Sequence, residues 1–132
     1  MTSQEAVMQA LQKMGYKPNI DEDNDIHLWY QMKHIYFLIE DEDNDYVTVH
    51  LPAIYTVKDE EEVPLLLATC NQLTRDLKLC KVFLSSDFKT VSASNEFLYC
   101  SEESLEQNIR YSLSILGIIR RTFRVHLDKM RS

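Results

Sequence analysis

The sequence predicts a single α+β domain over residues 1–132, with elements in the order α-β-β-β-(β)-α-β-β-α. Apolar residues recur at helical spacing near both ends and in the middle of the chain, whereas the segments between alternate as half-buried strands do. Polar turns separate the strands, as in an antiparallel meander. A chain of 132 residues with 45% hydrophobic content can bury one ordinary core.

The first half is predicted to hold one helix and most of the strands. Ser3 is the expected N-cap of a helix that Gly15 ends. Runs rich in aromatic and β-branched residues follow, with a tight reversal at Met32-Lys33. The predicted strands are Tyr16–Ile20, Ile26–Met32, His34–Glu40 and Tyr46–Leu51, the last of which ends before Pro52.

The second half is predicted to contain two helices that flank a hairpin. The acidic run 58–62 begins the first of them, because carboxylates are favoured near a helix N-terminus. Strands Leu79–Leu84 and Thr90–Leu98 follow, joined by a turn at Ser85-Ser86-Asp87. Ser101 opens the last helix in a variant of the capping box.

Alternation in the strands assigns side chains to two faces of the sheet. An aliphatic face belongs against the helices and carries Ile35, Phe37, Ile39, Val47, Val49 and Leu51. The opposite face is expected to be partly solvated. It carries His27, Trp29, Gln31, Tyr36, Leu38, Glu40, Tyr46, Thr48 and His50. Trp29, Tyr36 and Leu38 on this face are candidate partner-binding residues.

The last helix is apolar on more than one side, which indicates burial by more than one neighbour. Its core stripe consists of Leu105, Ile109, Leu116 and Phe123, with Leu113 and Leu127 near the edge. A second stripe consists of Tyr111, Ile115, Ile118 and Val125. We expect this stripe to contact a second copy of the chain in a homodimer; the alternative is an intramolecular neighbour such as the first helix.

The pentapeptide Asp-Glu-Asp-Asn-Asp occurs twice, at 21–25 and 41–45. Alternating carboxylates begin calcium-binding loops, but such loops need glycine at position six and a bidentate carboxylate at position twelve. The first copy offers Ile26 and Met32 there, and the second offers Tyr46 and Pro52. We therefore predict solvated structural turns and no metal site, with divalent-ion binding as an alternative.

Charge is distributed unevenly along the chain. Its net charge of −7 disfavours general nucleic-acid binding, which depends on neutralising phosphates. Residues 1–66 hold four Lys/Arg against fourteen Asp/Glu, whereas residues 67–132 hold ten against seven. The basic cluster in the last helix comprises Arg120, Arg121, Arg124, Lys129 and Arg131. We interpret it as cations favoured by the dipole at a helix C-terminus.

The sequence carries no recognisable catalytic motif. The four histidines show no metal-ligand spacing, although His27 and His50 could share a sheet face. Cys70, Cys80 and Cys100 form no C-x-x-C pair and are interpreted as core residues. Glu96 is interpreted as a solvent-facing carboxylate rather than a general acid or base. No catalytic residues and no cofactor are predicted.

Targeting signals and membrane spans are also not recognised. The N-terminal residues lack a basic patch followed by an apolar run, so no signal peptide is expected. No apolar stretch approaches membrane-spanning length. Three cysteines without a disulfide pattern fit a reducing compartment. These features together predict a cytoplasmic protein.

One succession of motifs resembles a known family. Gly15-Tyr16 ends the first helix, and the second helix carries Ala68-Thr69-Cys70-Asn71-Gln72-Leu73-Thr74. Lys81-Val82-Phe83-Leu84, Val91-Ser92-Ala93-Ser94-Asn95-Glu96 and a long amphipathic helix follow. From Val7 to Phe123 this succession resembles the bacterial YbjN-like family of proposed sensory-transduction regulators.

The resemblance implies a twisted antiparallel sheet with helices packed on it, in the fold of type III secretion chaperones. It also implies that the protein forms a homodimer, as such proteins often do, and that it has no catalytic residues and no cofactor. The secretion chaperones are small acidic dimers that hold an extended segment of a client protein. We therefore expect a non-catalytic interaction module, either a chaperone-like protein or a regulatory adaptor. Divalent-ion binding and an uncharacterised enzymatic activity remain the alternatives.

Overall fold

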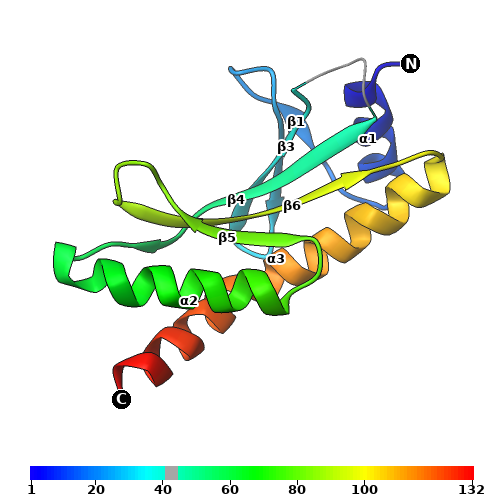
Figure 1. Cartoon of the computed structure of the whole chain (residues 1–132). Helices are drawn as coiled ribbons and strands as arrows, with labels where there is room; N and C mark the ends of the chain where they lie inside the picture. The colour runs from blue at the N-terminus through cyan, green and yellow to red at the C-terminus, as the bar shows by residue number, and fades with distance from the viewer. Residues whose placement is uncertain (41–44) are drawn as a thin grey trace.

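A computed structural model describes residues 1–40 and 45–132 and confirms the predicted α+β fold class (Figure 1). Its helices are α1 (Ser3–Lys13), α2 (Val63–Asp76) and α3 (Glu102–Arg131), with a 3₁₀ turn, η1 (Glu60–Glu62), before α2. Its strands are β1 (Asn19–Ile20), β2 (Ile26–Tyr30), β3 (Lys33–Leu38), β4 (Tyr46–Thr56), β5 (Cys80–Leu84) and β6 (Thr90–Leu98).

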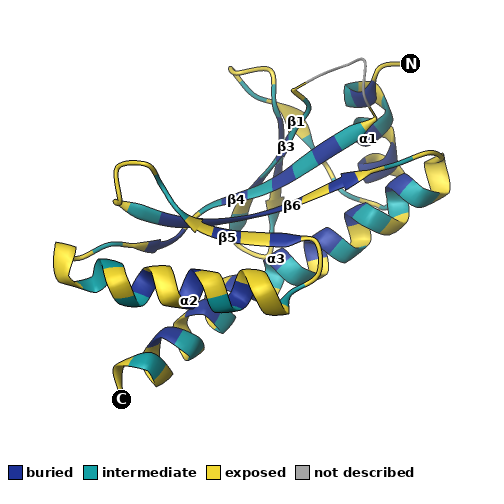
Figure 2. Cartoon of the chain, viewed as in Figure 1, coloured by how far each residue is buried: buried dark blue, intermediate teal, exposed yellow. Residues whose placement is uncertain are grey.

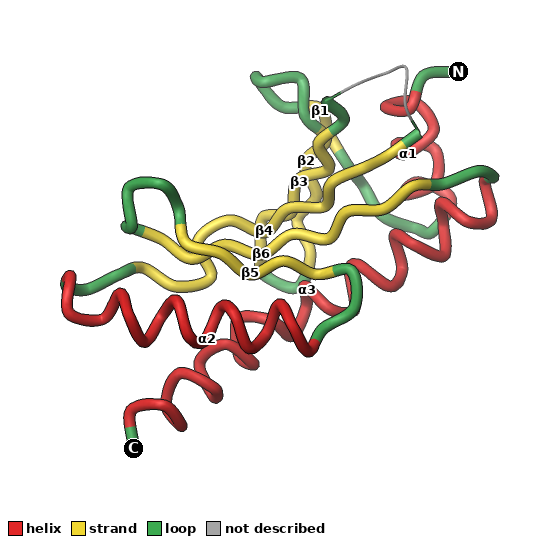
Figure 3. Tube along the Cα trace, in the orientation of Figure 1, coloured by secondary structure: helices red, strands yellow, loops and turns green. Residues whose placement is uncertain are grey.

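The strands form one twisted, open sheet in the order β1-β2-β3-β4-β6-β5, with every neighbouring pair antiparallel. The helices pack on one face of this sheet, and α3 runs obliquely across it (Figure 3). The opposite face lies open, which the alternating strand pattern predicted.

The core lies between the sheet and the helices (Figure 2). The predicted inward residues Ile35, Phe37, Val47, Val49 and Leu51 are buried, while Ile39 is half-buried just beyond the end of β3. The predicted core stripe of α3 is buried along its whole length, from Leu105 to Leu127. The packing of the aliphatic sheet face against the core stripe of α3 is the main apolar contact of the fold.

Several predicted element ends differ from the structure. Strand β1 covers Asn19–Ile20 rather than Tyr16–Ile20, since the Tyr16 N–H still donates to the Leu11 carbonyl at the end of α1 at 3.0 Å. Helix α2 begins at Val63, after the 3₁₀ turn η1, rather than within the acidic run 58–62.

The N-cap of α1 is Thr2, whose hydroxyl accepts a hydrogen bond from the Glu5 N–H at 3.1 Å, rather than Ser3. Strand β4 continues past Pro52 through a bulge at Ala53, which has φ of 54° and donates its N–H to the Ser92 hydroxyl at 3.1 Å. The bulge tolerates the proline because it changes the register with β6 there.

The β2–β3 reversal falls on Gln31 and Met32, one residue earlier than predicted, and both have positive φ, 48° and 64°. A two-residue hairpin turn of this kind usually contains Asn or Gly. The turn rests on α3 at Gly117, where an added Cβ would lie 3.0 Å from Oε1 of Gln31 and 3.5 Å from a ring carbon of Tyr30. Gly117 therefore lets the hairpin approach the helix closely.

A polar cluster ties the C-terminal end of α3 to η1. The Tyr55 hydroxyl and the Arg131 guanidinium both donate to one carboxylate oxygen of Glu62, and the Lys58 N–H donates to the other at 2.7 Å. Burial by itself raises the pKa of Glu62, but the hydrogen bonds from Tyr55, Lys58 and Asp59 and the charge of Arg131 outweigh it and lower the pKa overall.

We predict that Glu62→Ala lowers the free energy of unfolding at neutral pH by about 1–3 kcal/mol, because hydrogen bonds to a charged group are lost. The adjacent Glu61→Ala is the control and should change it by less than about 0.5 kcal/mol, since Glu61 is exposed. A lowered folded-state pKa means that the stabilisation is present above the unfolded-state pKa and disappears as pH falls through the folded-state pKa. Urea unfolding at pH 7 and pH 3 measures this; a difference that grows in acid would contradict the cluster's role.

Candidate protein-interaction surface

The open sheet face carries an aromatic strip that crosses five of the six strands. Directly opposed residues of antiparallel strands share a face, and the register pairs Trp29 with His34, His27 with Tyr36, and Tyr36 with His50. Beyond His50, strand β6 contributes only the small residues Ser94 and Ser92, which lets Phe83 of β5 reach His50. The aromatic strip is Trp29, His34, His27, Tyr36, His50 and Phe83.

The rings of the aromatic strip form two contacting groups, Trp29–His34–His27–Tyr36 and His50–Phe83, and the β3–β4 register pairs Tyr36 with His50 between them. Ring centroids lie 4.7 Å apart for Trp29 and His34, 5.0 Å for His34 and His27, and 5.3 Å for His27 and Tyr36. His50 and Phe83 stack at 6.3 Å. Burial among these neighbours lowers the pKa of His50. These separations are typical of favourable aromatic pairs, so the strip presents a largely preformed surface.

A hydrogen-bond chain orients the two histidines at the β1 end of the strip. Nδ1 of His27 lies 2.9 Å from the Asn19 side-chain oxygen, and Nε2 of His27 lies 2.8 Å from Nδ1 of His34. Because an amide oxygen only accepts, His27 donates through Nδ1 and accepts from His34 through Nε2. Both rings are therefore held against Trp29 and Tyr36.

The predicted sheet-face residues lie together. Trp29 is 57% exposed on β2, and Tyr36 and Leu38 are half-buried on the same face of the neighbouring strand β3. Gln31 does not join them because it turns toward Gly117. The sequence interpretation missed His34, Phe83 and Leu98, of which Leu98 is 73% exposed opposite Tyr46. The same alternation in β3, β5 and β6 would have placed these three residues on the open face.

The second stripe of α3 divides into two parts, and it lies away from the open sheet face. Tyr111 donates its hydroxyl to the Lys78 carbonyl at 3.1 Å, and Ile115 packs against the core, so these two have intramolecular neighbours. The contact at Tyr111 comes from the α2–β5 connection rather than from the first helix. Ile118 and Val125 remain 57% and 43% exposed.

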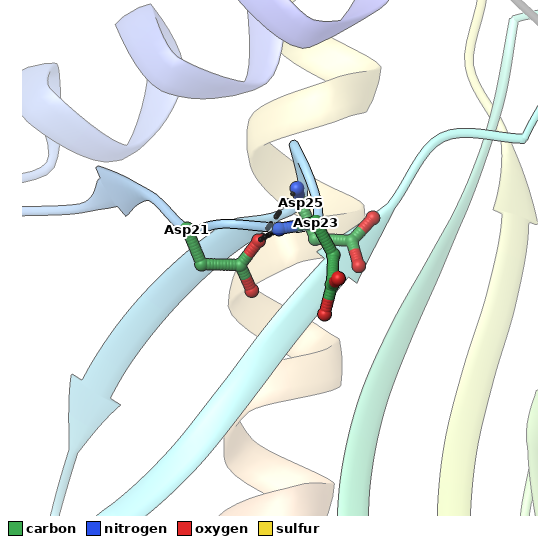
Figure 4. Close-up of side chains that lie close together, drawn as sticks. All are labelled: Asp21, Asp23 and Asp25. Atoms are coloured by element: carbon green, nitrogen blue, oxygen red, sulfur yellow. Dashed lines mark hydrogen bonds between the residues drawn. The ribbon is translucent and has the colours of Figure 1, made fainter.

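The first acidic turn gathers Asp21, Asp23 and Asp25, with one carboxylate oxygen of each within 4.8 Å of the others (Figure 4). One oxygen of Asp21 accepts the N–H groups of Asp23 and Asp25, both at 2.9 Å, and so fixes the loop between β1 and β2. Burial, followed by repulsion from Asp21, Asp23 and Glu40, raises the pKa of Asp25. In the second copy, residues 41–44 lie outside the described residues.

The cysteines are free, and two of them occupy the predicted core positions. Burial raises the pKa of Cys70 and of Cys80 to about 11, which keeps both thiols protonated and poorly nucleophilic at neutral pH. Cys100 is exposed beside the start of α3, so its assignment to the core was wrong. Its position in the connection to α3, rather than within a strand, explains the difference. Glu96 is solvent-facing as predicted and forms an ion pair with Lys81.

Comparison with known proteins identifies the fold. No protein-family model and no curated protein sequence matches the chain. Among solved structures, YbjN from E. coli, a proposed transcription regulator, superposes with a TM-score of 0.73 at 13% identity, covering 92% of this chain and 91% of YbjN. A chain of the HopA1–SchA chaperone–effector complex superposes with a TM-score of 0.60 at 9% identity, covering 91% of each chain.

An uncharacterised protein from Methanothermobacter thermautotrophicus also matches, with a TM-score of 0.51 at 13% identity over 92% of this chain and 99% of that one. The chain therefore has a YbjN-like, chaperone-like fold, as its sequence motifs indicated. Among the described helices, none is both long enough and apolar enough to cross a bilayer.

We predict that Trp29→Ala changes the free energy of unfolding by less than about 1 kcal/mol, because the side chain is largely exposed. The neighbouring Leu28→Ala should cost about 2–5 kcal/mol, since Leu28 is buried on the opposite face of the same strand. Urea unfolding followed by circular dichroism compares the two variants. Equal losses would show that Trp29 belongs to a packed interior.

For the acidic turn, we predict that Asp21→Ala destabilises the fold by about 0.5–2 kcal/mol, comparable to the loss of a helix cap, because two backbone N–H groups lose their acceptor. Asp23→Asn should instead stabilise it slightly at pH 7, since Asp23 repels the carboxylate of Asp25.

The pH dependence follows from the raised pKa of Asp25, whose repulsion destabilises the folded state as pH rises above the unfolded-state pKa. The gain from Asp23→Asn should therefore vanish at pH 3. Thermal unfolding at both pH values measures it. A rise in Tm at micromolar calcium that Asp23→Asn abolishes would favour ion binding over a structural turn.

Proposed function

We propose that the protein is a non-catalytic adaptor that binds a partner protein across the open face of its sheet. The observation that carries this proposal is the aromatic strip, which keeps Trp29 and Phe83 exposed on a face that no element of the described chain covers. Aromatic side chains that combine large apolar area with a polar edge dominate protein interfaces. Half-buried Leu38 and exposed Leu98 extend the same face.

The fold supports a role in protein binding. One structural neighbour comes from a chaperone–effector complex, and another is a proposed transcription regulator. The chain differs from both in about nine of ten aligned residues, so its own surface must supply the specificity. The proposal includes a bacterial cytoplasmic location, which the three free thiols and the bacterial YbjN neighbour support.

Self-association through α3 stays a separate prediction. Ile118 and Val125 are the two exposed residues of the second stripe that a second copy could cover. Tyr111 and Ile115 are already engaged within the chain, which leaves a smaller apolar area than the sequence indicated.

The experiment compares tagged wild-type protein with two double variants, each incubated with native cell extract. Trp29→Ser/Phe83→Ser removes two exposed rings of the aromatic strip, whereas Leu67→Ser/Ile118→Ser removes two exposed apolar side chains of α2 and α3. We expect a partner identified by mass spectrometry to bind the wild type and the Leu67→Ser/Ile118→Ser variant, and to bind the strip variant at least about tenfold more weakly. A purified partner that binds the strip variant as tightly as wild type would overturn the proposal.

A further inference from the structure

A concave site lies between the β2–β3 turn and the second half of α3. It has a volume of about 590 Å³ and is lined by Lys33, Gly117, Arg120, Arg121, Arg124 and Val125. Its volume lies in the range of ligand-binding clefts, and four of its six lining residues carry a positive charge. We refer to these six residues as the basic groove.

The shape of the basic groove depends on how the hairpin sits on the helix. The turn at Gln31 and Met32 reaches α3 at Gly117, where the missing side chain leaves room for Gln31 and Tyr30. Lys33, whose ammonium donates to the Gln31 carbonyl at 3.0 Å, leaves the turn on the groove side. The hairpin thus forms one wall, and the arginines of α3 form the other.

The helix dipole does not account for these arginines, contrary to the interpretation from sequence. Helix α3 ends at Arg131, and only Lys129 and Arg131 lie in its last turn. Arg124 lies seven residues before that end, and Arg120 and Arg121 lie further back. A helix dipole acts within about one turn of the terminus, so it favours Lys129 and Arg131 but not the groove arginines.

The groove arginines also have no carboxylate partner within the described part of the chain. Ion pairs between described residues engage Lys13, Arg75, Lys81 and Arg131, whereas the side chains of Arg120, Arg121 and Arg124 form neither an ion pair nor a hydrogen bond with a described residue. Three exposed guanidinium groups beside Lys33 repel one another in an acidic protein. An anion bound between them would relieve this repulsion.

We propose that the basic groove binds an acidic segment of the partner protein. Guanidinium groups match carboxylates in paired, two-point hydrogen bonds, and Val125 offers an apolar contact beside them. The groove and the aromatic strip lie on opposite faces of the sheet at the same end of the β2–β3 hairpin, because the Tyr30–Lys33 pair directly follows the Trp29–His34 pair and successive pairs point to opposite faces. A partner lying on the strip can therefore continue around the hairpin into the groove.

Nucleic acid is the less favoured occupant. The chain has a net charge of −7, and residues 1–66 alone hold fourteen acidic against four basic side chains. An extended nucleic acid bound in the groove would also lie near these acidic side chains, which repel its phosphates. A short acidic peptide segment contacts the groove alone.

The proposal rests on the adaptor function and extends it by naming the chemistry of the segment that is bound.

The test uses fluorescein-labelled hexaglutamate as the probe and measures its anisotropy on titration with the purified full chain at low salt. The groove variant is Arg120→Glu/Arg121→Glu/Arg124→Glu. Its matched control is Arg75→Glu/Lys89→Glu/Arg110→Glu, which reverses three cations outside the groove. Each triple substitution removes three positive and adds three negative charges, so both take the net charge from −7 to −13.

We expect wild-type binding to weaken as salt is added, and the groove variant to bind at least about tenfold more weakly than the control. Circular dichroism establishes that both variants fold; if the groove variant does not, the three Arg→Gln substitutions replace it with the same expectation. Equal losses in the groove and control variants would overturn the proposal. So would tighter binding of a six-nucleotide oligothymidylate than of hexaglutamate, or no saturable binding by the wild type.

The Trp29→Ser/Phe83→Ser variant separates this proposal from the adaptor function. It should bind hexaglutamate within about twofold of wild type, because neither substitution removes a groove charge. Loss of the partner protein from this variant with hexaglutamate binding retained supports both sites. Hexaglutamate binding that is lost in this variant as well would show that the peptide does not occupy the groove.

Discussion

Packing of α3 against one face of the sheet is the constraint on which the other features depend. The helix has 30 residues and therefore extends about 45 Å, enough to cross the whole sheet obliquely. Its buried stripe, from Leu105 to Leu127, packs on the aliphatic face of β4 and β6. Because α1 and α2 pack beside α3 on the same face, the second face of the sheet is left open. The far end of α3 is then held by Glu62 through Arg131.

The same packing decides the position of the β2–β3 hairpin. The turn of this hairpin meets α3 near the middle of the helix, at Gly117. Glycine in a helix interior costs about 1 kcal/mol of helix stability relative to alanine. The packing of the turn against the helix, which the glycine permits, offsets this cost. The positive φ angles of Gln31 and Met32 are a second local cost at this contact. The aromatic strip and the basic groove meet at this hairpin, where both proposed contacts with a partner would begin.

The structural neighbours share this topology at 9–13% sequence identity. At this level, two chains can have a similar pattern of buried positions but few identical side chains. A fold of this kind accommodates different functions, so the proposed role must rest on surfaces of the chain itself. The open face and the groove have complementary chemistry: one offers aromatic area with polar edges, and the other offers fixed positive charge. An adaptor that uses both would gain affinity from the first and orientation from the second.

Period-two alternation and helical spacing were sufficient to predict the element order, the inward faces of β3 and β4 and the buried stripe of α3. They depend on local periodicity, which any solvent-facing element must show. The bulge at Ala53 could not be predicted from Pro52, because only pairing with β6 and the hydroxyl of Ser92 stabilise it. Likewise, alternation assigned Trp29 to the open face, but its contact with the histidine pair depends on strand register.

By itself, the sequence determined the fold class, the aliphatic core and the absence of a catalytic motif, since these follow from composition and short-range periodicity. Tertiary structure alone decided which residues share each surface. It joined Phe83 to His50 across β6, engaged Tyr111 with the Lys78 carbonyl, and placed Lys33 opposite Arg120, Arg121 and Arg124. Residues nearly ninety positions apart meet there, and no local pattern encodes which strands become neighbours or where a hairpin rests on a helix.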